Sequence, residues 1–130
     1  MAPAAALSVL YAEDNEVNAE LVRQLVMLRS AVTLRIAPSG TAALEMAQLD
    51  PPDLMLVDMN LGDMTGIELA HALQGDRATR DVPLVALSAD ALPEQIRAAM
   101  DSGFEAYLTK PIDFQQLLST LDGYAQRVNP

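Results

Sequence analysis

Five short runs of apolar residues recur along this 130-residue chain, and the segments between them are amphipathic. The starts of successive runs lie 22 to 30 residues apart, which leaves room for one helix in each gap. Runs three and four are continuously apolar, as expected of parallel strands buried on both faces. This alternation predicts an α/β doubly wound sheet with right-handed crossovers. The predicted strands are Leu7–Tyr11, Val32–Ile36, Leu54–Val57, Leu84–Leu87 and Ala106–Leu108.

The helices between these strands are indicated by periodicity and by capping residues. In the first gap, the spacing of Val17, Leu21, Leu25 and Leu28 predicts one buried helical stripe. The second helix carries Ala43, Leu44 and Ala47, and the third is expected to face inward with Ile67, Ala70 and Leu73. The predicted end signals are Ser39, the capping box Thr65–Glu68, Pro93, Gly103, and Asp113 with Gln116, where Ile112 and Leu117 form a staple.

Composition excludes several classes of protein. The chain has 18 acidic and 8 basic residues, a formal charge of −10, and 51% apolar residues, which together indicate a soluble globular domain. The acidic balance argues against nucleic-acid binding, and the lack of cysteine excludes disulfides and thiolate metal sites. Without an apolar run of membrane-spanning length or a signal-peptide pattern, we expect a cytoplasmic protein with no membrane contact. We expect one domain over residues 7–126, with tails at 1–6 and 127–130.

Polar residues follow four of the five predicted strands. Glu13 and Asp14 come after the first, Asp58 after the third, Ser88 after the fourth and Lys110 after the fifth. Ligands of open parallel sheets bind at the carboxyl ends of the strands, so we expect these side chains to share one site. The second strand is followed by an uncharged segment, which predicts an edge position away from the site.

Three of these residues suggest a metal site. Carboxylates that converge on a small volume repel one another unless a cation neutralises them, and oxygen ligands without His or Cys favour Mg²⁺. The alternative for Glu13 and Asp14 is helix capping, and for Asp58 it is a solvated turn. Their conjunction at neighbouring strand ends favours the metal site.

Lys110, the only lysine, suits a phosphoryl oxygen as a compact charge, although it could also be a surface lysine by chance. Ser88 offers a hydroxyl at the same edge, or alternatively a helix cap. Tyr107 is out of phase with Leu108 and is expected to face outward, unless it is an ordinary half-buried strand aromatic. No Gly-rich phosphate loop occurs, and the single histidine, His71, lies in a predicted helix.

In this order and spacing, four segments resemble the receiver domain of two-component response regulators over about residues 8–124. They are Val9–Asn15, Asp58–Gly66, Leu87–Ala89 and Tyr107–Pro111. The resemblance implies a flavodoxin-like fold with five parallel strands in the order 2-1-3-4-5 and five flanking helices. The resemblance is greatest to the receivers of hybrid histidine kinases and phosphorelays. The sequence does not decide between a stand-alone regulator and a domain of a larger kinase.

The resemblance also implies a role for each matched residue. Asp58 is similar to the phosphoacceptor, and the metal ligands are Glu13, Asp14, Asp58 and the backbone carbonyl of Asn60. Ser88 and Lys110 would hold phosphoryl oxygens, Tyr107 would be the aromatic switch residue, and Lys110–Pro111 would be a cis peptide bond.

The sequence departs from the family pattern at two positions. Gly62 stands where many receivers have proline, which predicts a more mobile loop after Asp58. Glu13 replaces the commoner aspartate, and its extra methylene still reaches a Mg²⁺-bound water.

The implied function is a phosphorylation switch, supplied by a histidine kinase or a histidine phosphotransfer protein, rather than a turnover enzyme. An unidentified downstream partner would read the face formed by the fourth helix, the fifth strand and the fifth helix. One alternative is a phosphohydrolase of the haloacid-dehalogenase type, which needs an acid where this chain has Asn60. The other is a degenerate receiver that only binds partners.

Overall fold

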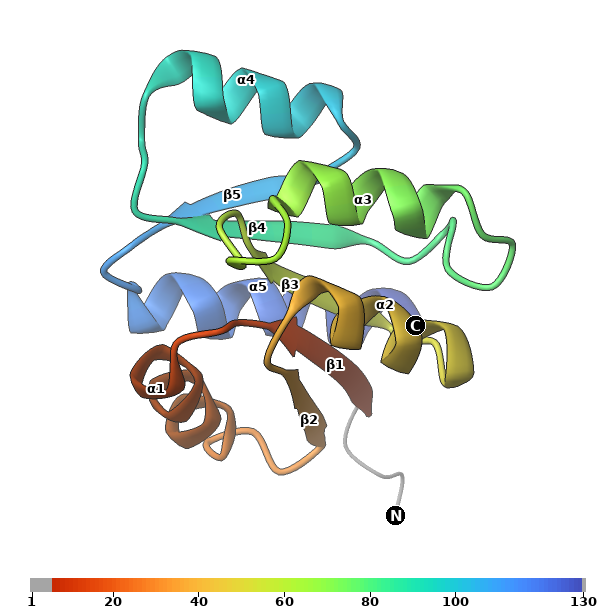
Figure 1. Cartoon of the computed structure of the whole chain (residues 1–130). Helices are drawn as coiled ribbons and strands as arrows, with labels where there is room; N and C mark the ends of the chain where they lie inside the picture. The colour runs from red at the N-terminus through yellow and green to blue at the C-terminus, as the bar shows by residue number, and fades with distance from the viewer. Residues whose placement is uncertain (1–5, 130) are drawn as a thin grey trace.

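A computed structural model describes residues 6–129 as one five-stranded parallel sheet flanked by five helices (Figure 1). The strand order is β2-β1-β3-β4-β5, as the family resemblance implied. The strands are β1 (Leu7–Ala12), β2 (Val32–Ala37), β3 (Leu54–Asp58), β4 (Leu84–Ser88) and β5 (Ala106–Thr109). The helices are α1 (Glu16–Val26), α2 (Gly40–Leu49), α3 (Gly66–Gln74), α4 (Pro93–Asp101) and α5 (Phe114–Val128).

The predicted strands begin where the structure places them, and each continues one residue further than predicted. These added residues are polar in β3, β4 and β5, so periodicity alone does not include them. Asp58, Ser88 and Thr109 nevertheless keep extended backbone pairing with the neighbouring strand. Asp58 and Ser88 are thereby fixed by the sheet itself.

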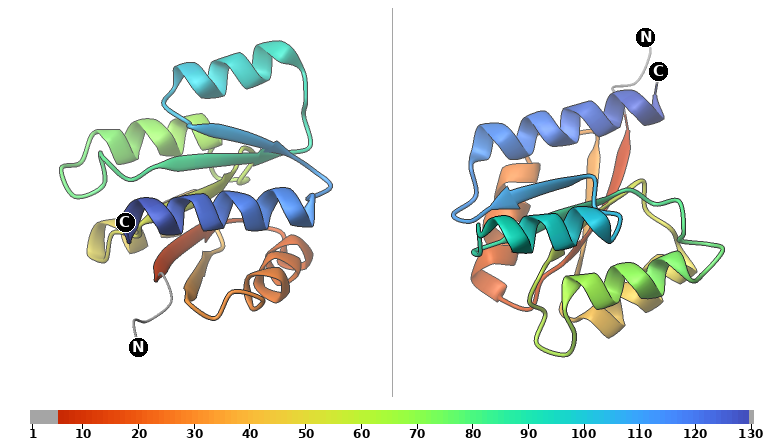
Figure 2. Two further views of the ribbon diagram at one scale, coloured as in Figure 1. Left: turned by 180° about the vertical axis from the view of Figure 1, so that it is seen from behind. Right: turned by 90° about the horizontal axis from the view of Figure 1, so that it is seen from above.

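The sheet separates two apolar cores. Helices α1 and α5 cover one face, and helices α2, α3 and α4 cover the other (Figure 1 and Figure 2). Alternate residues of each strand serve opposite faces, so Val9 and Tyr11 belong to the first core while Leu10 and Ala12 belong to the second. β3 and β4 are buried throughout, which explains their continuous apolar sequences.

The predicted helix starts are confirmed at their caps. The side chains of Ser39 and Asp113 accept hydrogen bonds from backbone N–H groups in the first turns of α2 and α5. Thr65 and Glu68 form the reciprocal capping box of α3. After α4, Gly103 adopts a φ of +105°, a left-handed conformation that few other residues accept.

The stripe predicted for α1 is wrong, apart from Leu25. The side chains that face the sheet are Ala19, Val22, Leu25 and Val26. Three members of the predicted stripe are instead exposed: Val17 by 76%, Leu21 by 40% and Leu28 by 64%. The helix therefore carries two apolar series of similar spacing. The one that contains Val22 packs against the sheet, and the one that contains Val17 and Leu21 is exposed.

Other deviations are small. Ile67, which the pattern places inward, is only half-buried. Helix α5 continues to Val128, past residue 127 where a tail was expected to begin, and Arg127 pairs with Glu105 at 2.8 Å. The expected tail residues 1–5 and 130 lie outside the described part of the chain. Within residues 6–129, no helix combines the length and the apolar character needed to cross a membrane.

Candidate functional site

Four strands, β1, β3, β4 and β5, deliver polar side chains to one pocket at their carboxyl ends. Figure 1 shows how these strands lie in the sheet. The chain reverses its strand order between β1 and β3, and ligands of doubly wound sheets bind at such a point. β2, whose end carries no charge, lies at the edge of the sheet as predicted. The pocket is lined by Asp14, Asn15, Asn18, Asp58, Met59, Asn60, Ser88, Ala89, Asp90, Gln95, Tyr107 and Lys110.

Glu13, Asp14 and Asp58 form an acidic cluster beside this pocket. Each offers a carboxylate oxygen, and the three oxygens lie within 4.8 Å of one another. Glu13 and Asp58 are buried, whereas Asp14 is exposed. The cluster contains only hard oxygen donors and neither imidazole nor thiolate, so its chemistry fits Mg²⁺.

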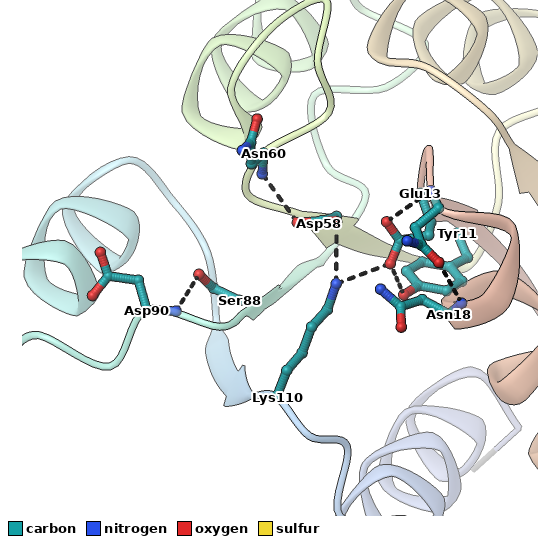
Figure 3. Close-up of polar contacts among 9 residues, drawn as sticks. Tyr11, Glu13, Asn18, Asp58, Asn60, Ser88, Asp90 and Lys110 are labelled. Atoms are coloured by element: carbon teal, nitrogen blue, oxygen red, sulfur yellow. Dashed lines mark hydrogen bonds and ion pairs between the residues drawn. The ribbon is translucent and has the colours of Figure 1, made fainter.

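Lys110 bridges the two buried carboxylates. Its Nζ donates to Oε1 of Glu13 at 2.9 Å and to Oδ2 of Asp58 at 3.1 Å (Figure 3). Burial lowers the pKa of Lys110, but its hydrogen bond to Glu13 and the charges of both acids outweigh this effect and raise the pKa. The ammonium is therefore held charged between the acids. The following peptide bond, to Pro111, is cis as the resemblance implied.

The two buried acids differ in their affinity for a proton. Burial raises the pKa of Glu13, but contact with Asp58 and the hydrogen bond from Lys110 help to outweigh it, and the pKa falls to about 2. Burial, and then the neighbouring Glu13, raise the pKa of Asp58 to about 6 against the opposing hydrogen bond from the Asn60 backbone. Without a cation, Glu13 thus carries the more persistent charge. A cation at the site would favour the ionised, nucleophilic form of Asp58.

The loop after Asp58 begins at the pocket, which Met59 and Asn60 line. The backbone N–H of Asn60 donates to Oδ1 of Asp58 at 3.0 Å, and Asn60 pairs with Thr65 in an isolated antiparallel bridge. The side chain of Asn60 is exposed. Gly62 has a φ of +84°, whereas a proline ring fixes φ near about −65°. The backbone of this loop is therefore one that the common proline of the family would not adopt.

Asp63 anchors the same loop to α2. Its carboxylate accepts hydrogen bonds from the backbone N–H groups of Gly40 and Thr41, at 2.9 and 3.0 Å, and from the Thr41 hydroxyl at 2.9 Å. Glycine at position 62 predicts mobility, but these three bonds tie the adjoining residue to the first turn of a neighbouring helix. The glycine in the sequence predicts a more mobile loop, but it does not reveal that Asp63 restrains the loop in this way.

Ser88 lies on the opposite side of Lys110 from Glu13 and contacts Asp90 (Figure 3). Tyr107 contacts Asp90 as well. Oγ of Ser88 accepts a hydrogen bond from the Asp90 backbone N–H at 3.0 Å, and the Tyr107 hydroxyl donates to the Asp90 carbonyl at 2.6 Å. Tyr107 is half-buried, in agreement with the more ordinary of its two interpretations. The β4–α4 loop is thus the physical link between these two side chains.

Sequence reasoning missed Tyr11 and Asp90. In the sequence, Tyr11 is recognisable only as part of an apolar strand. In the structure, its hydroxyl donates to Oε1 of Glu13 at 2.7 Å. Burial, and then the hydrogen bond to Glu13, raise the pKa of Tyr11 above its ordinary range, so the hydroxyl stays protonated. The alternation of a strand, which places residues 11 and 13 on the same side, was the available signal.

Comparison with known proteins assigns the chain to a family. A family model described as the response regulator receiver domain matches residues 9–122. The chain belongs to this receiver family. A curated relative, the polar-differentiation response regulator DivK from Brucella ovis, is 35% identical over 117 residues, which cover 90% of this chain and 94% of the relative.

Solved receiver structures share the fold. The receiver domain of sensor histidine kinase PA1611 from Pseudomonas aeruginosa PAO1, solved with a magnesium ion in its active site cleft, matches with a TM-score of 0.84 and 24% identity over 93% of this chain and 98% of its own. The receiver domain of Ssk1 from Saccharomyces cerevisiae, solved with the histidine phosphotransfer protein Ypd1, matches with a TM-score of 0.82 and 24% identity over 92% of this chain and 89% of its own.

Membership of the receiver family places this chain in two-component signalling. The match covers nearly the whole sheet and every strand end that contributes to the pocket. The acidic cluster and Lys110 lie together at the edge where a doubly wound fold binds its ligand.

Proposed function

We propose that this receiver domain is a cytoplasmic phosphorylation switch in which Asp58 accepts a phosphoryl group from a phosphohistidine. The donor would be a histidine kinase or a histidine phosphotransfer protein. The observation that carries this proposal is the meeting of three carboxylates and the only lysine of the chain at one pocket. One carboxylate serves as the nucleophile. The other two would bind a cation, and the lysine ammonium offsets negative charge.

A Mg²⁺ ion would be held by the acidic cluster and by the backbone carbonyl of Asn60. When bound, the ion supplies positive charge that offsets the carboxylates and the phosphoryl oxygens. Asp14 is the exposed member of the cluster and lines the pocket, so it can take the ion from solvent with its waters. The donor set supports this assignment because it contains oxygen ligands only.

In the transfer, an oxygen of Asp58 forms a bond to phosphorus while the bond between phosphorus and the imidazole nitrogen breaks. The imidazole keeps the electron pair and takes up a proton. Lys110 already donates to Asp58 at 3.1 Å, so its ammonium is in place to hold a phosphoryl oxygen. Ser88 accepts rather than donates in its bond with Asp90, which leaves its own proton for a second phosphoryl oxygen.

An exposed apolar surface beside the pocket supports a protein donor. We define the α1 patch as Val17, Leu21, Leu28 and Phe114, each at least 40% exposed. It adjoins the pocket because Asn18, from the same helix, lines it. A protein that brings a phosphohistidine to the pocket alongside this helix would cover the apolar side chains, so we place the docking surface of the donor on the α1 patch. The complex of yeast Ssk1 with Ypd1 supports a phosphotransfer protein as one class of donor.

The outgoing signal would leave through α4, β5 and α5. A phosphoryl group would draw the Ser88 hydroxyl away from the Asp90 backbone N–H, and Asp90 also holds Tyr107. Loss of one bond at Asp90 would thus alter the restraint on Tyr107, which packs against the core beneath α4. A downstream partner that reads this face would sense the phosphate, with no turnover chemistry required.

Neither alternative function has comparable support. A haloacid-dehalogenase-type phosphohydrolase needs an acid two residues after the nucleophile, where this chain has the amide of Asn60. A degenerate receiver would lack a member of the site, but carboxylates, hydroxyl and ammonium are all present in one pocket.

Incubation with acetyl phosphate or phosphoramidate and Mg²⁺ tests the proposal. We expect stable phosphate labelling of the parent protein, which mass spectrometry maps to Asp58. The label should be absent from Asp58→Asn. Rapid multiple turnover would favour the hydrolase, the absence of labelling would favour the degenerate receiver, and a label on another aspartate would refute the assignment of Asp58.

A further inference from the structure

Tyr11 places a hydroxyl group in the interior of the sheet. The residue is 0% exposed, in a strand that lies between β2 and β3, and it belongs to the core shared with α1 and α5. A phenylalanine ring would fill almost the same space without a polar atom. A buried tyrosine hydroxyl requires a hydrogen-bond partner, so its presence here needs an explanation beyond packing.

The partner of this hydroxyl is the acidic residue that distinguishes the site from the common family pattern. Tyr11 donates to Oε1 of Glu13 at 2.7 Å, and Lys110 donates to the same oxygen at 2.9 Å. Oε1 is therefore saturated by two protein donors. The other oxygen, Oε2, has only a long contact of 3.4 Å from the backbone N–H of Asn15.

The unequal bonding of its two oxygens fixes the carboxylate of Glu13. The side chain is 0% exposed, so no bulk water competes for its oxygens. Glutamate has one more rotatable bond than aspartate, and its carboxylate must be held if it is to serve the same site. Two donors on Oε1 determine the rotation of the group and leave Oε2 free to serve the cation.

We propose that Tyr11 is a positioning residue that holds Oε1 of Glu13 against Lys110 and thereby presents Oε2 to the divalent cation. This inference rests on the Mg²⁺ site of the proposed function. It implies that Tyr11 and Glu13 act as a pair, because an aspartate at position 13 is one methylene shorter and would not meet the hydroxyl. The tyrosine is then useful only when position 13 is glutamate.

The experiment is a double-mutant cycle on Mg²⁺ affinity. Dissociation constants are measured by ¹H–¹⁵N NMR titration with MgCl₂ in the parent, Tyr11→Phe, Glu13→Asp and the double variant. We expect Tyr11→Phe to weaken binding about tenfold, the usual effect of removing a group that orients a metal ligand. In the Glu13→Asp background, the same change should leave the affinity unaltered.

Tyr124→Phe is the matched control. Tyr124 also donates to a glutamate carboxylate at 2.7 Å, but its acceptor is Glu105, outside the pocket. Its loss should lower the thermal stability without changing Mg²⁺ affinity. A purely structural role for Tyr11 predicts that the two tyrosine variants behave alike.

Several results would overturn the inference. They are an unchanged affinity in Tyr11→Phe, an equal loss in Tyr124→Phe, or the same loss in both backgrounds at position 13. If the parent itself binds no Mg²⁺, the proposed function fails. If the parent binds Mg²⁺ and any of the results above is found, only the inference fails, so the two failures are distinguished.

Thermal stability gives a second readout of the pairing. Removing the Tyr11 hydroxyl should destabilise the parent, in which the hydroxyl is bonded to Glu13. The same removal should stabilise the Glu13→Asp variant, in which the buried hydroxyl has lost its partner. A change of the same sign in both backgrounds would also refute the pairing.

Discussion

Asp58→Asn should make the metal-free protein more stable at neutral pH. The carboxylate of Asp58 is buried beside a second acid, and burial and then Glu13 raise its pKa to about 6, so at neutral pH the folded protein must carry an ionised group that it disfavours relative to the unfolded chain. Asparagine has nearly the same shape and no charge. It therefore removes the repulsion from Glu13 and the cost of burying a second negative charge, while Lys110 keeps its bond to Glu13.

The magnitude follows from the shift in pKa. Raising the value for Asp58 from 3.8 to about 6 corresponds to about 3 kcal/mol of unfolding free energy, at about 1.36 kcal/mol for each pKa unit. The folded state binds the proton more tightly than the unfolded state. Stability of the parent consequently falls as the pH rises from about 4 through 6. Asparagine does not titrate, so the advantage of the variant should be near zero at about pH 4 and complete above about pH 7.

The assay is urea unfolding followed by circular dichroism, with EDTA present, at intervals between about pH 4 and pH 8. We expect the variant to be more stable by about 2–3 kcal/mol at about pH 7.5, and MgCl₂ should reduce this difference by stabilising the parent. Asp63→Asn is a control of opposite sign, because hydrogen bonds from the Thr41 and Gly40 backbone lower the pKa of Asp63. A variant no more stable than the parent near neutral pH, or an advantage that persists in acid, would refute the reasoning.

Three further outcomes are expected. Asp14→Ala should abolish Mg²⁺-dependent labelling by acetyl phosphate while its circular dichroism stays that of the parent, because Asp14 is exposed; labelling at the parental rate would contradict the metal assignment. Thr65→Ala should lower the unfolding free energy in urea by about 1 kcal/mol through loss of the α3 capping box, and no change would contradict that role. Beryllofluoride, a phosphoryl mimic, should shift NMR signals of Tyr107 and α4 strongly in the parent and weakly in Ser88→Ala; equal shifts would exclude Ser88 as the link.

The strands of this fold can be predicted from sequence because each begins with a short apolar run, which is uninterrupted in β3 and β4, where both faces are buried. This signal locates the start of every strand and hence the polar residues that follow. Capping residues act locally, so Ser39, Thr65 and Asp113 were also predictable. The same local reasoning placed Asp58 and Lys110 at strand ends, where the structure brings their charged groups to within 3.1 Å.

The orientation of α1 was not predictable because the helix carries two apolar series. Periodicity indicates that an apolar stripe exists, but it does not say which of two stripes packs against the sheet and which stays exposed. Val17 and Leu21 consequently lie on the surface, although their spacing predicts burial. The role of the Tyr11 hydroxyl was missed for a different reason. The sequence shows an aromatic residue in an apolar strand, but it does not show which residue the hydroxyl group contacts.

The anchoring of Asp63 on α2 has a consequence for hydrogen exchange. The amide protons of Gly40 and Thr41 are bonded to a side chain of the loop that follows Asp58, and not to helix carbonyls. They can exchange with solvent deuterium only when that carboxylate releases them. These two amides, which precede Asp63 by 23 and 22 residues, therefore report how often the loop opens. Their protection, compared with and without a phosphoryl mimic, measures whether the loop tightens or loosens when the site is filled.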